Sequence, residues 1–251
     1  MKFALISDIH ANATALRLVL EYIRAQDGIE KIYCTGDVVG FHTSPGECID
    51  FLQECHVECI AGNHDAGVTG KLGQEKFPVE CWEAIQWTRN NLNKRQLSFL
   101  ESLSNHVIIN RQFWLMHGIF GDPHHYMVGD WKHRYAFLRL RLAGIRFGFY
   151  GHIHKQTCFK GESSVFSPTV HPVKTLQSVT LDSESIYLIN PGTVGHPRTI
   201  DTAARFAIVD LDKGMINFEH VQYDYSVVLA RTLEVFPSHI SLYKRFQSSE
   251  V

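Results

Sequence analysis

Short apolar runs alternate with stretches of helical periodicity near the start of this chain. The runs at 3–6, 31–35 and 57–61 have the length and composition of strands buried on both faces. Residues 12–28 carry apolar side chains at helical spacing, and Ser44-Pro45-Gly46-Glu47 is a capping box that opens a helix running to about residue 55. This alternation predicts a parallel sheet whose strands are joined by right-handed helical crossovers.

The rest of the chain mixes helices and strands, and no linker or change of composition divides it, so we expect one domain over residues 1–251. Segment 66–105 is helical, and we expect it either to lie over the functional edge of the sheet or simply to cover the sheet. Segment 167–185 is rich in Ser, Thr and Pro and is expected to be a mobile loop. The other predicted elements are a helix from Asn93 to Leu103 with a capping box at Asn93 and Gln96, a hairpin at 107–109 and 113–116, a helix at 130–142, a strand at 146–150, a strand, turn and strand at 155–166, a strand at 186–189, a hairpin at 205–209 and 215–221, and a last helix from Asp224 to Leu233.

Acidic, amide and imidazole side chains gather where the predicted strands end. Asp8 and His10 follow the first strand two residues apart, so an extended backbone would direct both to one side. Carboxyl ends of parallel strands share one edge of a sheet, which is where α/β proteins bind ligands. We therefore expect the polar side chains that follow these strands to meet. They are Asp8, His10, Asp37, Asn63, His117, His152 and His154.

These seven side chains have the chemistry of a metal site. Seven ligands exceed what one ion can use, but two divalent ions fit if one carboxylate bridges them, and Asp37 is the expected bridge because it follows the middle strand of the pattern. Oxygen and imidazole ligands without a thiolate favour Mn, Fe, Zn, Co or Ni over Ca or Mg, and we expect manganese to serve in vitro.

Two such cations suit displacement at phosphorus. They are expected to hold a bridging hydroxide that attacks a phosphoester. His64 is not needed as a ligand, so we expect it to give a proton to the leaving oxygen or a hydrogen bond to the transition state; the alternative is a packed loop histidine.

The composition narrows the setting of this chemistry. The chain has 251 residues, a net charge of -2 and a pI near 6.7, so bulk charge gives no sign of nucleic-acid or acidic-membrane binding. No run has the length of a membrane span or the pattern of a signal peptide, which predicts a cytoplasmic protein. Six cysteines without a CxxC pair are expected to be reduced and mostly buried. Among the other histidines, His42, His124, His125 and His196 are expected on the surface rather than in contact with substrate; the alternative for His196 is that the turn before it and Arg198 faces the pocket. Arg198 is expected to bind a phosphate oxygen or to make a structural ion pair.

Five separated motifs occur in one order along the chain: Asp8-x-His10, Gly36-Asp37, Gly62-Asn63-His64-Asp65, His117 and Gly151-His152-x-His154. In this order they resemble the calcineurin-like metallophosphoesterase superfamily, and Asn190-Pro191-Gly192-Thr193-Val194-Gly195 resembles its small bacterial and archaeal phosphodiesterase-like branch. The resemblance implies a four-layered α/β/β/α sandwich with mixed sheets and helices on the outer faces. It also implies that His64 is the acid, that one metal takes Asp8, His10, Asp37 and His154, and that the other takes Asp37, Asn63, His117 and His152.

The chain also departs from what the resemblance implies. Relatives often have Gly at Ala11, a Tyr-Gly-Pro-like run at Phe41-His42-Thr43-Ser44, Gln at His196 and a shorter segment 167–185. These positions border the expected pocket, so they affect substrate choice. Val38 follows Asp37, so the Gly-Asp-Arg-Gly motif of the Ser/Thr protein phosphatases is absent, which weakens the case for a phosphoprotein substrate.

The sequence therefore predicts a dimetal phosphoesterase, and more specifically a phosphodiesterase, acting on a small nucleotide-like or other phosphodiester. We expect a monomer or small homo-oligomer, with neither membrane nor nucleic acid as a partner. One alternative is a phosphomonoesterase or phosphoprotein phosphatase. Another is a non-catalytic binding scaffold on the same fold, which would hold no metal.

Overall fold

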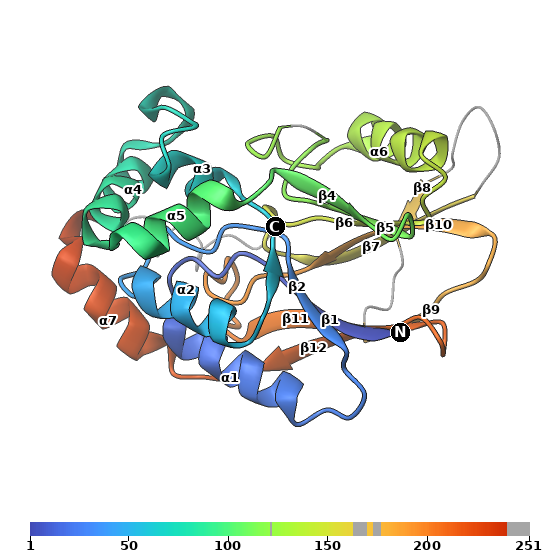
Figure 1. Ribbon diagram of the computed structural model, residues 1–251, viewed down its shortest axis with the longest axis horizontal. Helices are drawn as coiled ribbons and strands as arrows, with labels where there is room; N and C mark the ends of the chain where they lie inside the picture. Colours follow the sequence, from blue (N-terminus) through green and yellow to red (C-terminus); the bar gives the residue numbers. More distant parts are fainter. Residues whose placement is uncertain (121, 163–169, 173–176, 240–251) are drawn as a thin grey trace.

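Two six-stranded sheets face each other, with helices on their outer faces (Figure 1). The structure is a computed structural model that describes residues 1–120, 122–162, 170–172 and 177–239. The strand orders are β3-β2-β1-β11-β12-β9 and β4-β5-β6-β10-β7-β8. This arrangement is the predicted four-layered α/β/β/α sandwich with mixed sheets, so the fold prediction is confirmed.

The first sheet is built around β1, which pairs parallel with β2 and antiparallel with β11. β2 in turn pairs parallel with β3, so the predicted parallel arrangement of the first three strands is confirmed. The third strand has two residues rather than the five expected at 57–61. The strands are β1 (Lys2–Ile6), β2 (Lys31–Cys34), β3 (Glu58–Cys59), β9 (Ser178–Thr180), β11 (Ala204–Asp210) and β12 (Met215–Val221).

The second sheet has a parallel centre formed by β5, β6 and β10. β4 pairs antiparallel with β5 as the predicted hairpin, and β7 pairs antiparallel with β10. The strands are β4 (His106–Ile109), β5 (Phe113–Met116), β6 (Phe147–Phe149), β7 (Gln156–Glu162), β8 (Val170–Pro172) and β10 (Ser185–Pro191).

Alternation along β1 explains how one strand serves two cores. Phe3 and Leu5 point into the core between the two sheets, where Phe3 stacks on Phe113 of β5 with ring centroids 5.1 Å apart. Ala4 and Ile6 point to the other side, into the core beneath the helices. All four side chains are fully buried, so the strand is apolar on both faces as its sequence predicts.

The helices begin largely where the capping signals place them. The Asn12 side chain accepts from the amide of Ala15, and Asn93 with Gln96 forms the predicted capping box. The box predicted at Ser44 is wrong, since the Ser44 side chain makes no capping hydrogen bond, although a helix does start at Pro45. None of the described helices is long and apolar enough to cross a membrane. The helices are α1 (Ala13–Arg24), α2 (Pro45–Glu54), α3 (Asn63–Val68), α4 (Val79–Asn91), α5 (Lys94–Ser102), α6 (Asp130–Leu142) and α7 (Tyr225–Val235), with 3-10 turns at Gln74–Lys76 and Pro237–His239.

The segment predicted as a mobile loop at 167–185 includes regular structure. β8 extends the second sheet and β9 extends the first, so this segment supplies an edge strand to each sheet. Composition gave no sign of strands this short. The predictions for residues 163–169 and 173–176, including the second strand expected at 155–166, lie outside the described residues.

Candidate metal centre

The seven side chains singled out from the sequence meet at one edge of the sandwich. They follow β1, β2, β5 and β6 or, for Asn63, open helix α3, so segments from both sheets contribute. None of the seven is more than 5% exposed. Their role as metal ligands stays a prediction, but the structure brings together every candidate that the strand-end pattern indicated.

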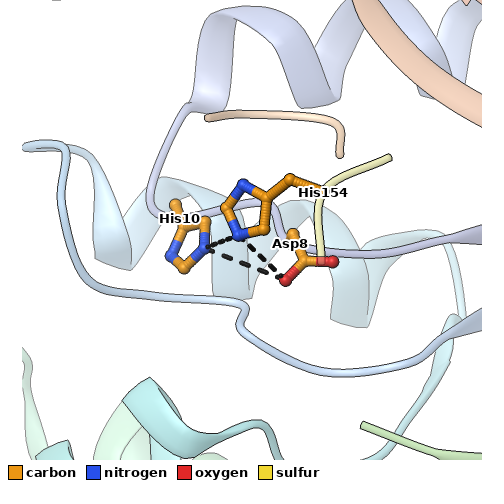
Figure 2. A group of neighbouring side chains, drawn as sticks. All are labelled: Asp8, His10 and His154. Atoms are coloured by element: carbon orange, nitrogen blue, oxygen red, sulfur yellow. Dashed lines mark hydrogen bonds and ion pairs between the residues drawn. The ribbon is translucent and has the colours of Figure 1, made fainter. Parts of the chain in front are cut away.

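Asp8, His10 and His154 form one group (Figure 2). The Nε2 atom of His154 lies 3.3 Å from Oδ1 of Asp8 and 3.1 Å from Nε2 of His10. Asp37 lies beside this group, with its Oδ2 atom 3.6 Å from Nε2 of His10. A carboxylate, two imidazoles and a second, shared carboxylate thus surround one point.

Asp37, His117 and His152 form a neighbouring group. Oδ2 of Asp37 lies 3.2 Å from Nε2 of His117, and Oδ1 of Asn63 lies 3.2 Å from the same nitrogen. Because Oδ2 of Asp37 faces both His10 and His117, this carboxylate stands between the two groups, where a bridging ligand is needed.

Each of the four imidazoles has one nitrogen against a backbone carbonyl, which fixes its ring orientation and leaves the other nitrogen for the cluster. Three of the rings use Nδ1 in this way and so present Nε2, whereas His152 uses Nε2 and so presents Nδ1. The nitrogen–oxygen pairs are His10 Nδ1 to Val39 at 3.3 Å, His117 Nδ1 to Thr35 at 2.7 Å, His154 Nδ1 to His196 at 2.7 Å and His152 Nε2 to His124 at 3.0 Å.

These tautomers test whether the site suits a metal. When both Nδ1–H groups donate to carbonyls, neutral His10 and His154 turn two nitrogen lone pairs toward each other at 3.1 Å. Two lone pairs at this separation repel, and a cation held between them turns the repulsion into coordination. The donor set is nitrogen and oxygen throughout, so the residues present fit divalent transition-metal ions.

The electrostatics of the cluster also favour positive charge. Burial alone would raise the pKa of Asp8 and of Asp37, but the imidazoles beside them, chiefly His154 and His117 respectively, lower each to about 2. Burial alone would lower the pKa of His117, but the Asp37 carboxylate beside it raises that pKa to about 9. The carboxylates thus remain charged, and they favour the protonated, positively charged form of His117. A divalent cation would supply positive charge at the same place.

Most of the candidate ligands lie at residues whose backbone is left-handed rather than extended. Asp8 and His10 do lie in one group, but the extended backbone assumed for them is wrong, since their φ angles are 52° and 50°. Asp37, His152 and His154 also have positive φ angles, of 54°, 71° and 57°. Such a conformation costs on the order of 1 kcal/mol at each non-glycine residue, and it gathers here around the candidate ligands.

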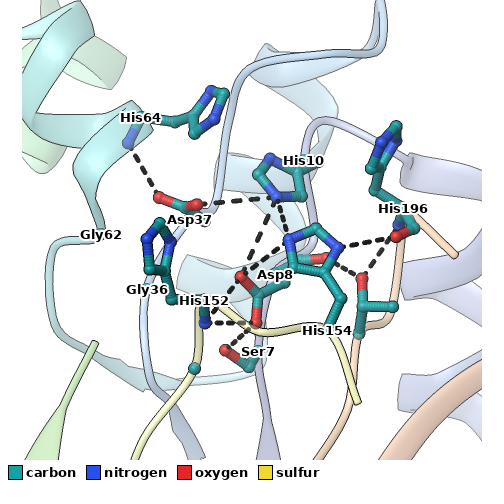
Figure 3. Close-up of polar contacts among 12 residues, drawn as sticks. Ser7, Asp8, His10, Gly36, Asp37, Gly62, His64, His152, His154 and His196 are labelled. Carbon is teal, nitrogen blue, oxygen red and sulfur yellow. Dashed lines mark hydrogen bonds and ion pairs between the residues drawn. The ribbon is translucent and has the colours of Figure 1, made fainter. Parts of the chain in front are cut away.

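Close packing of backbone around the carboxylates leaves no room for side chains at two glycines. A Cβ atom at Gly62 would lie 2.1 Å from Oδ1 of Asp37, and one at Gly151 would lie 2.3 Å from the hydroxyl of Ser7. The Ser7 hydroxyl itself donates to Oδ2 of Asp8 at 2.6 Å, and the amide of His152 reaches the same carboxylate at 3.1 Å (Figure 3). The carboxylates are therefore held by short-range contacts that only glycine permits.

His64 lies beside the shared carboxylate rather than within either group. Its backbone amide donates to Oδ1 of Asp37 at 2.9 Å, and its ring packs edge-on against His10 at 4.8 Å (Figure 3). Burial lowers the pKa of His64 to about 4. A neutral ring in this place offers an N–H group. The ring is also near enough to Asp37 and His10 to make a third possible ligand group, so a test must separate the two roles.

A profile of the calcineurin-like phosphoesterase superfamily domain matches residues 1–214. The chain belongs to the calcineurin-like phosphoesterase superfamily. It is 34% identical to an uncharacterized protein of Methanocaldococcus jannaschii over 226 residues, which cover 88% of this chain and 87% of the relative.

Solved structures agree with this assignment. A metallophosphoesterase from Sphaerobacter thermophilus is 29% identical, covers 98% of each chain and superposes with a TM-score of 0.76. A hypothetical protein from Pyrococcus horikoshii OT3 has the same TM-score at 17% identity, over 100% of this chain and 99% of the other, and shows the shared fold. Members of the superfamily typically bind divalent metals, and the Asp and His groups described above have the residues to do so.

Around the candidate ligands of this superfamily member lies a rim of four side chains: Phe41, Tyr126, His196 and Arg198. Phe41 and His196 stack almost parallel, with ring centroids 4.1 Å apart, and Tyr126 stacks on the candidate ligand His152 at 3.9 Å. Nη2 of Arg198 lies 3.3 Å from Nε2 of His154, and its guanidinium lies 5.9 Å from the centre of the Tyr126 ring. The rim therefore touches the candidate ligands on both sides.

The surface placement predicted for His42 and His196 is wrong, because both side chains are buried. His42 lies between Thr232 and Gly195, with Nδ1 2.9 Å from the Thr232 hydroxyl oxygen and Nε2 3.1 Å from the carbonyl of Gly195, and burial lowers its pKa to about 3. His125 is exposed as predicted, and His124 is half-buried. A histidine count along the chain cannot separate these cases, since the burial comes from α7 and the 193–198 turn packing on the 40–42 turn.

Several residues that hold the site gave no sequence signal of their own role. Thr193 donates to the carbonyl of Asp8 at 2.7 Å, and Asn190 donates to that of Gly151 at 2.7 Å. Asp65 accepts three backbone amides, those of Val38, Val39 and Gly62 at 2.9 to 3.3 Å, which explains how an acid so near the cluster serves as a brace. The Asn190–Gly195 run marks Asn190 and Thr193 as a motif, but their partners become visible only in the fold.

Helical segment 66–105 reaches the site through Phe77, and α3 begins just before the segment. Asn63 and His64 open α3, and Phe77 packs against His64 and His124 with ring centroids 5.7 and 5.8 Å apart. Farther along, Ile85 and Leu100 belong to the core beneath the helices of the first sheet.

Proposed function

We propose that this protein is a metal-dependent phosphodiesterase that uses two divalent cations. Seven buried oxygen and nitrogen donors around a shared Asp37 carboxylate are the observation that carries the proposal. One cation would take Asp8, His10, Asp37 and His154, and the other Asp37, Asn63, His117 and His152. Superfamily membership implies phosphoester hydrolysis; the choice of a diester and the division of the ligands are our proposals.

When bound, such cations supply a water acidic enough to attack near neutral pH and positive charge for the phosphate oxygens. The protein's own part is to hold that charge in place. The carbonyls of Val39, Thr35, His196 and His124 fix the imidazoles, and Ser7 fixes the Asp8 carboxylate. A site fixed in this way needs little rearrangement during the reaction, which is how buried polar sites lower barriers.

His64 is proposed to assist departure of the leaving oxygen. Its amide is anchored to Asp37, so its ring is kept beside the reacting phosphate. Because burial keeps the ring neutral at pH 7, its N–H would donate a hydrogen bond to the developing negative charge on the leaving oxygen.

Arg198 is proposed to bind a phosphate oxygen, since its guanidinium already reaches the edge of the cluster at His154. One guanidinium suits the single negative charge of a phosphodiester. Tyr126, which is 42% exposed beside His152, offers an apolar surface for the second ester group. These two contacts favour a diester over a monoester, whose second negative charge has no further arginine after Asp37, where Val38 stands.

We keep the rest of the setting predicted from the sequence as part of the proposal: a small phosphorylated substrate, manganese as an effective metal in vitro, and a cytoplasmic location. Among the described residues all six cysteines are free thiols and four of them are buried, as a reducing compartment would require.

The test compares hydrolysis of bis(p-nitrophenyl) phosphate and p-nitrophenyl phosphate by protein stripped of metal and reloaded with Mn²⁺. The proposal expects manganese-dependent nitrophenol release with a higher kcat/KM for the diester. Asp37→Asn is the inactive comparison, and His125→Gln, an exposed histidine, is the matched control that should keep activity. A faster reaction with the monoester would favour the phosphomonoesterase. A folded protein that binds no metal would favour the scaffold.

A further inference from the structure

Helix α6 carries apolar side chains on two opposite faces. Its inner face, with Ala136, Phe137 and Leu140, packs against the outer face of the second sheet and is almost completely buried. The outer face carries Trp131, Tyr135, Leu138 and Leu142, which are 66%, 36%, 44% and 75% exposed. We call these four residues the outer stripe.

The outer stripe is the main apolar feature of the described surface. Of the eleven large apolar side chains that are exposed among the described residues, six fall between Tyr126 and Leu142. Figure 1 shows α6 on the outside of the second sheet, with no other described element beyond it. A surface helix ordinarily keeps one polar face, so two apolar faces indicate a second packing partner.

The spacing of the stripe identifies what that partner can be. Trp131, Tyr135, Leu138 and Leu142 follow one another at intervals of four, three and four residues, which is the seam of a coiled coil. We propose that α6 is the interface of a homodimer, in which the α6 helices of two copies pack antiparallel across a twofold axis. A twofold interface must be self-complementary, and this stripe satisfies that requirement.

The antiparallel register follows from the symmetry. Centring the twofold between Tyr135 and Leu138 places Trp131 against Leu142 of the second copy and Tyr135 against Leu138 of the second copy. Each layer then joins a ring to a leucine, so large side chains face smaller ones and the seam can close at the crossing angle of about +20° typical of such packing.

Charges beside the seam support the same register. Asp130, at the start of α6, is paired with Arg134 of its own helix at 2.9 Å and comes level with the last turn of the other helix, where Arg141 of the second copy would be a further cationic partner. Two such pairs form across the twofold. Arg139 lies over the rings of Trp114 and Phe120 and donates to the Tyr135 hydroxyl at 2.7 Å. Lys132 donates to the carbonyl of Tyr126 at 2.8 Å and lies over the Trp131 ring, so both cations are held by groups of their own copy.

The area is sufficient for a stable pair. The exposed parts of the four stripe side chains amount to roughly 500 Å² per copy when judged from the size of such side chains. Val128, which is 58% exposed, and the stems of the flanking arginines add to this value. The total approaches the ~800 Å² per partner of a standard stable interface.

The interface would also hold the segment that leads into the metal centre. Lys132 and His133 of α6 donate to the carbonyls of Tyr126 and Met127, and Tyr126 stacks on His152. Fixing α6 between two copies therefore braces the loop from which the rim reaches a candidate ligand.

Sedimentation equilibrium of the full chain tests the proposal. The wild-type protein is expected at twice its chain mass of 28.6 kDa down to low micromolar concentration. Trp131→Ser and Leu142→Ser should each raise the dimer dissociation constant on the order of 100-fold, because the twofold symmetry removes the Trp131–Leu142 contact at both ends of the seam. Ile200→Ser is the matched control, since Ile200 is as exposed as Leu142 at 75% but lies outside the stripe. Circular dichroism verifies that each variant is folded.

A charge exchange tests the register itself. Asp130→Arg and Arg141→Asp should each raise the dissociation constant on the order of tenfold, and the double variant should return it toward the wild-type value. A wild-type protein that is monomeric at 100 µM, whether or not it binds acidic lipid vesicles, overturns the proposal. So does a dimer that the stripe substitutions leave intact. Weakening by the single charge changes without recovery in the double variant overturns the antiparallel register.

Discussion

The ligand shell and the rim around it are built in different ways. Every candidate ligand imidazole has one nitrogen fixed by a backbone carbonyl, and five of the seven candidate ligands lie at left-handed backbone positions that follow strand ends. Rim residues are held instead by ring stacking between loops that are distant in the sequence, such as Phe41 on His196. The shell depends on local backbone geometry, whereas the rim depends on how separate segments pack.

This difference assigns the two regions different parts of the proposed function. A shell built from strand ends and tight turns tolerates little change, since a Cβ at Gly62 or Gly151 would strike a carboxylate or Ser7. The ligand shell is therefore expected to determine which reaction the protein catalyses. Stacked rings on loops can be exchanged one by one, so the rim is the region that can adapt to a substrate. Substitutions ordered from shell to rim should give effects of decreasing size on turnover.

The largest effect is expected at the carboxylate between the two groups. Asp37→Asn removes the negative charge that faces both His10 and His117, so neither cation keeps its full affinity. We expect kcat with the diester to fall by ~10³-fold or more, because cation charge stabilisation is worth several kcal/mol. Steady-state kinetics and metal analysis on the folded variant measure it. Activity within tenfold of wild type would mean that the shell does not depend on a shared carboxylate.

His64 separates catalysis from metal binding. His64→Gln should keep both cations while lowering kcat by about 10²- to 10³-fold, since hydrogen-bond or proton donation to a leaving group has this size. Metal analysis together with kcat for the diester measures both properties. Loss of a cation from this variant would place His64 in the shell as a ligand, the role that its distance to Asp37 and His10 leaves open.

A smaller effect is expected in the rim at Arg198. Arg198→Gln removes the guanidinium beside His154 and should lower kcat/KM for the diester roughly 10- to 100-fold, as expected for one charge-assisted hydrogen bond. The loss should come mainly from KM, and both cations should remain. Arg198→Lys keeps the charge without the planar fork and should recover part of the loss. An equal loss in metal content would show that Arg198 supports the shell instead.

His42 lies behind the rim, and its substitution is expected to change the stability of the fold rather than turnover. Burial lowers the pKa of His42 to about 3, whereas the ring in the unfolded chain takes up a proton near its ordinary pKa of 6.5. Between these values the unfolded state binds the extra proton, so the folded state loses stability as the pH falls from about 6.5 toward 3. His42→Gln should flatten the pH dependence of the unfolding free energy there, by up to ~1.4 kcal/mol per pH unit. Urea unfolding from pH 6.5 to 4.5 measures it, and identical slopes in the two proteins would contradict a buried neutral ring.

The sequence predicts the shell well for a physical reason. Asp8 and Asp37 follow the parallel strands β1 and β2 of the first sheet, and His117 and His152 follow the parallel strands β5 and β6 of the second, so topology places each pair at one edge. The way in which the side chains are aimed was not predictable, because Asp8 and His10 reach the cluster through positive φ angles rather than by alternation along a strand. Strand-end chemistry indicates which residues meet, and turn geometry decides how they meet.

The rim shows where the same approach fails. His196 was expected on the surface, yet it is buried and stacks on Phe41, which lies 155 positions earlier in the chain. Helix α6 fails in the opposite sense. Its apolar residues predict a helix, but they cannot show which of its two faces meets the sheet and which is left exposed. The burial of His196 and the exposure of one face of α6 both depend on long-range packing, which the local periodicity of the sequence does not reveal.

Counting manganese ions in the folded protein is the most direct test of a two-cation centre. Metal-depleted protein is titrated with Mn²⁺, bound ions are counted by mass spectrometry, and electron paramagnetic resonance reports whether they are coupled. We expect two ions per chain with the spectrum of an exchange-coupled pair, and a single uncoupled ion in Asn63→Ala and in His117→Ala. A wild-type protein with an intact fold that holds one ion or none, or two ions that are magnetically independent, would contradict the centre described here.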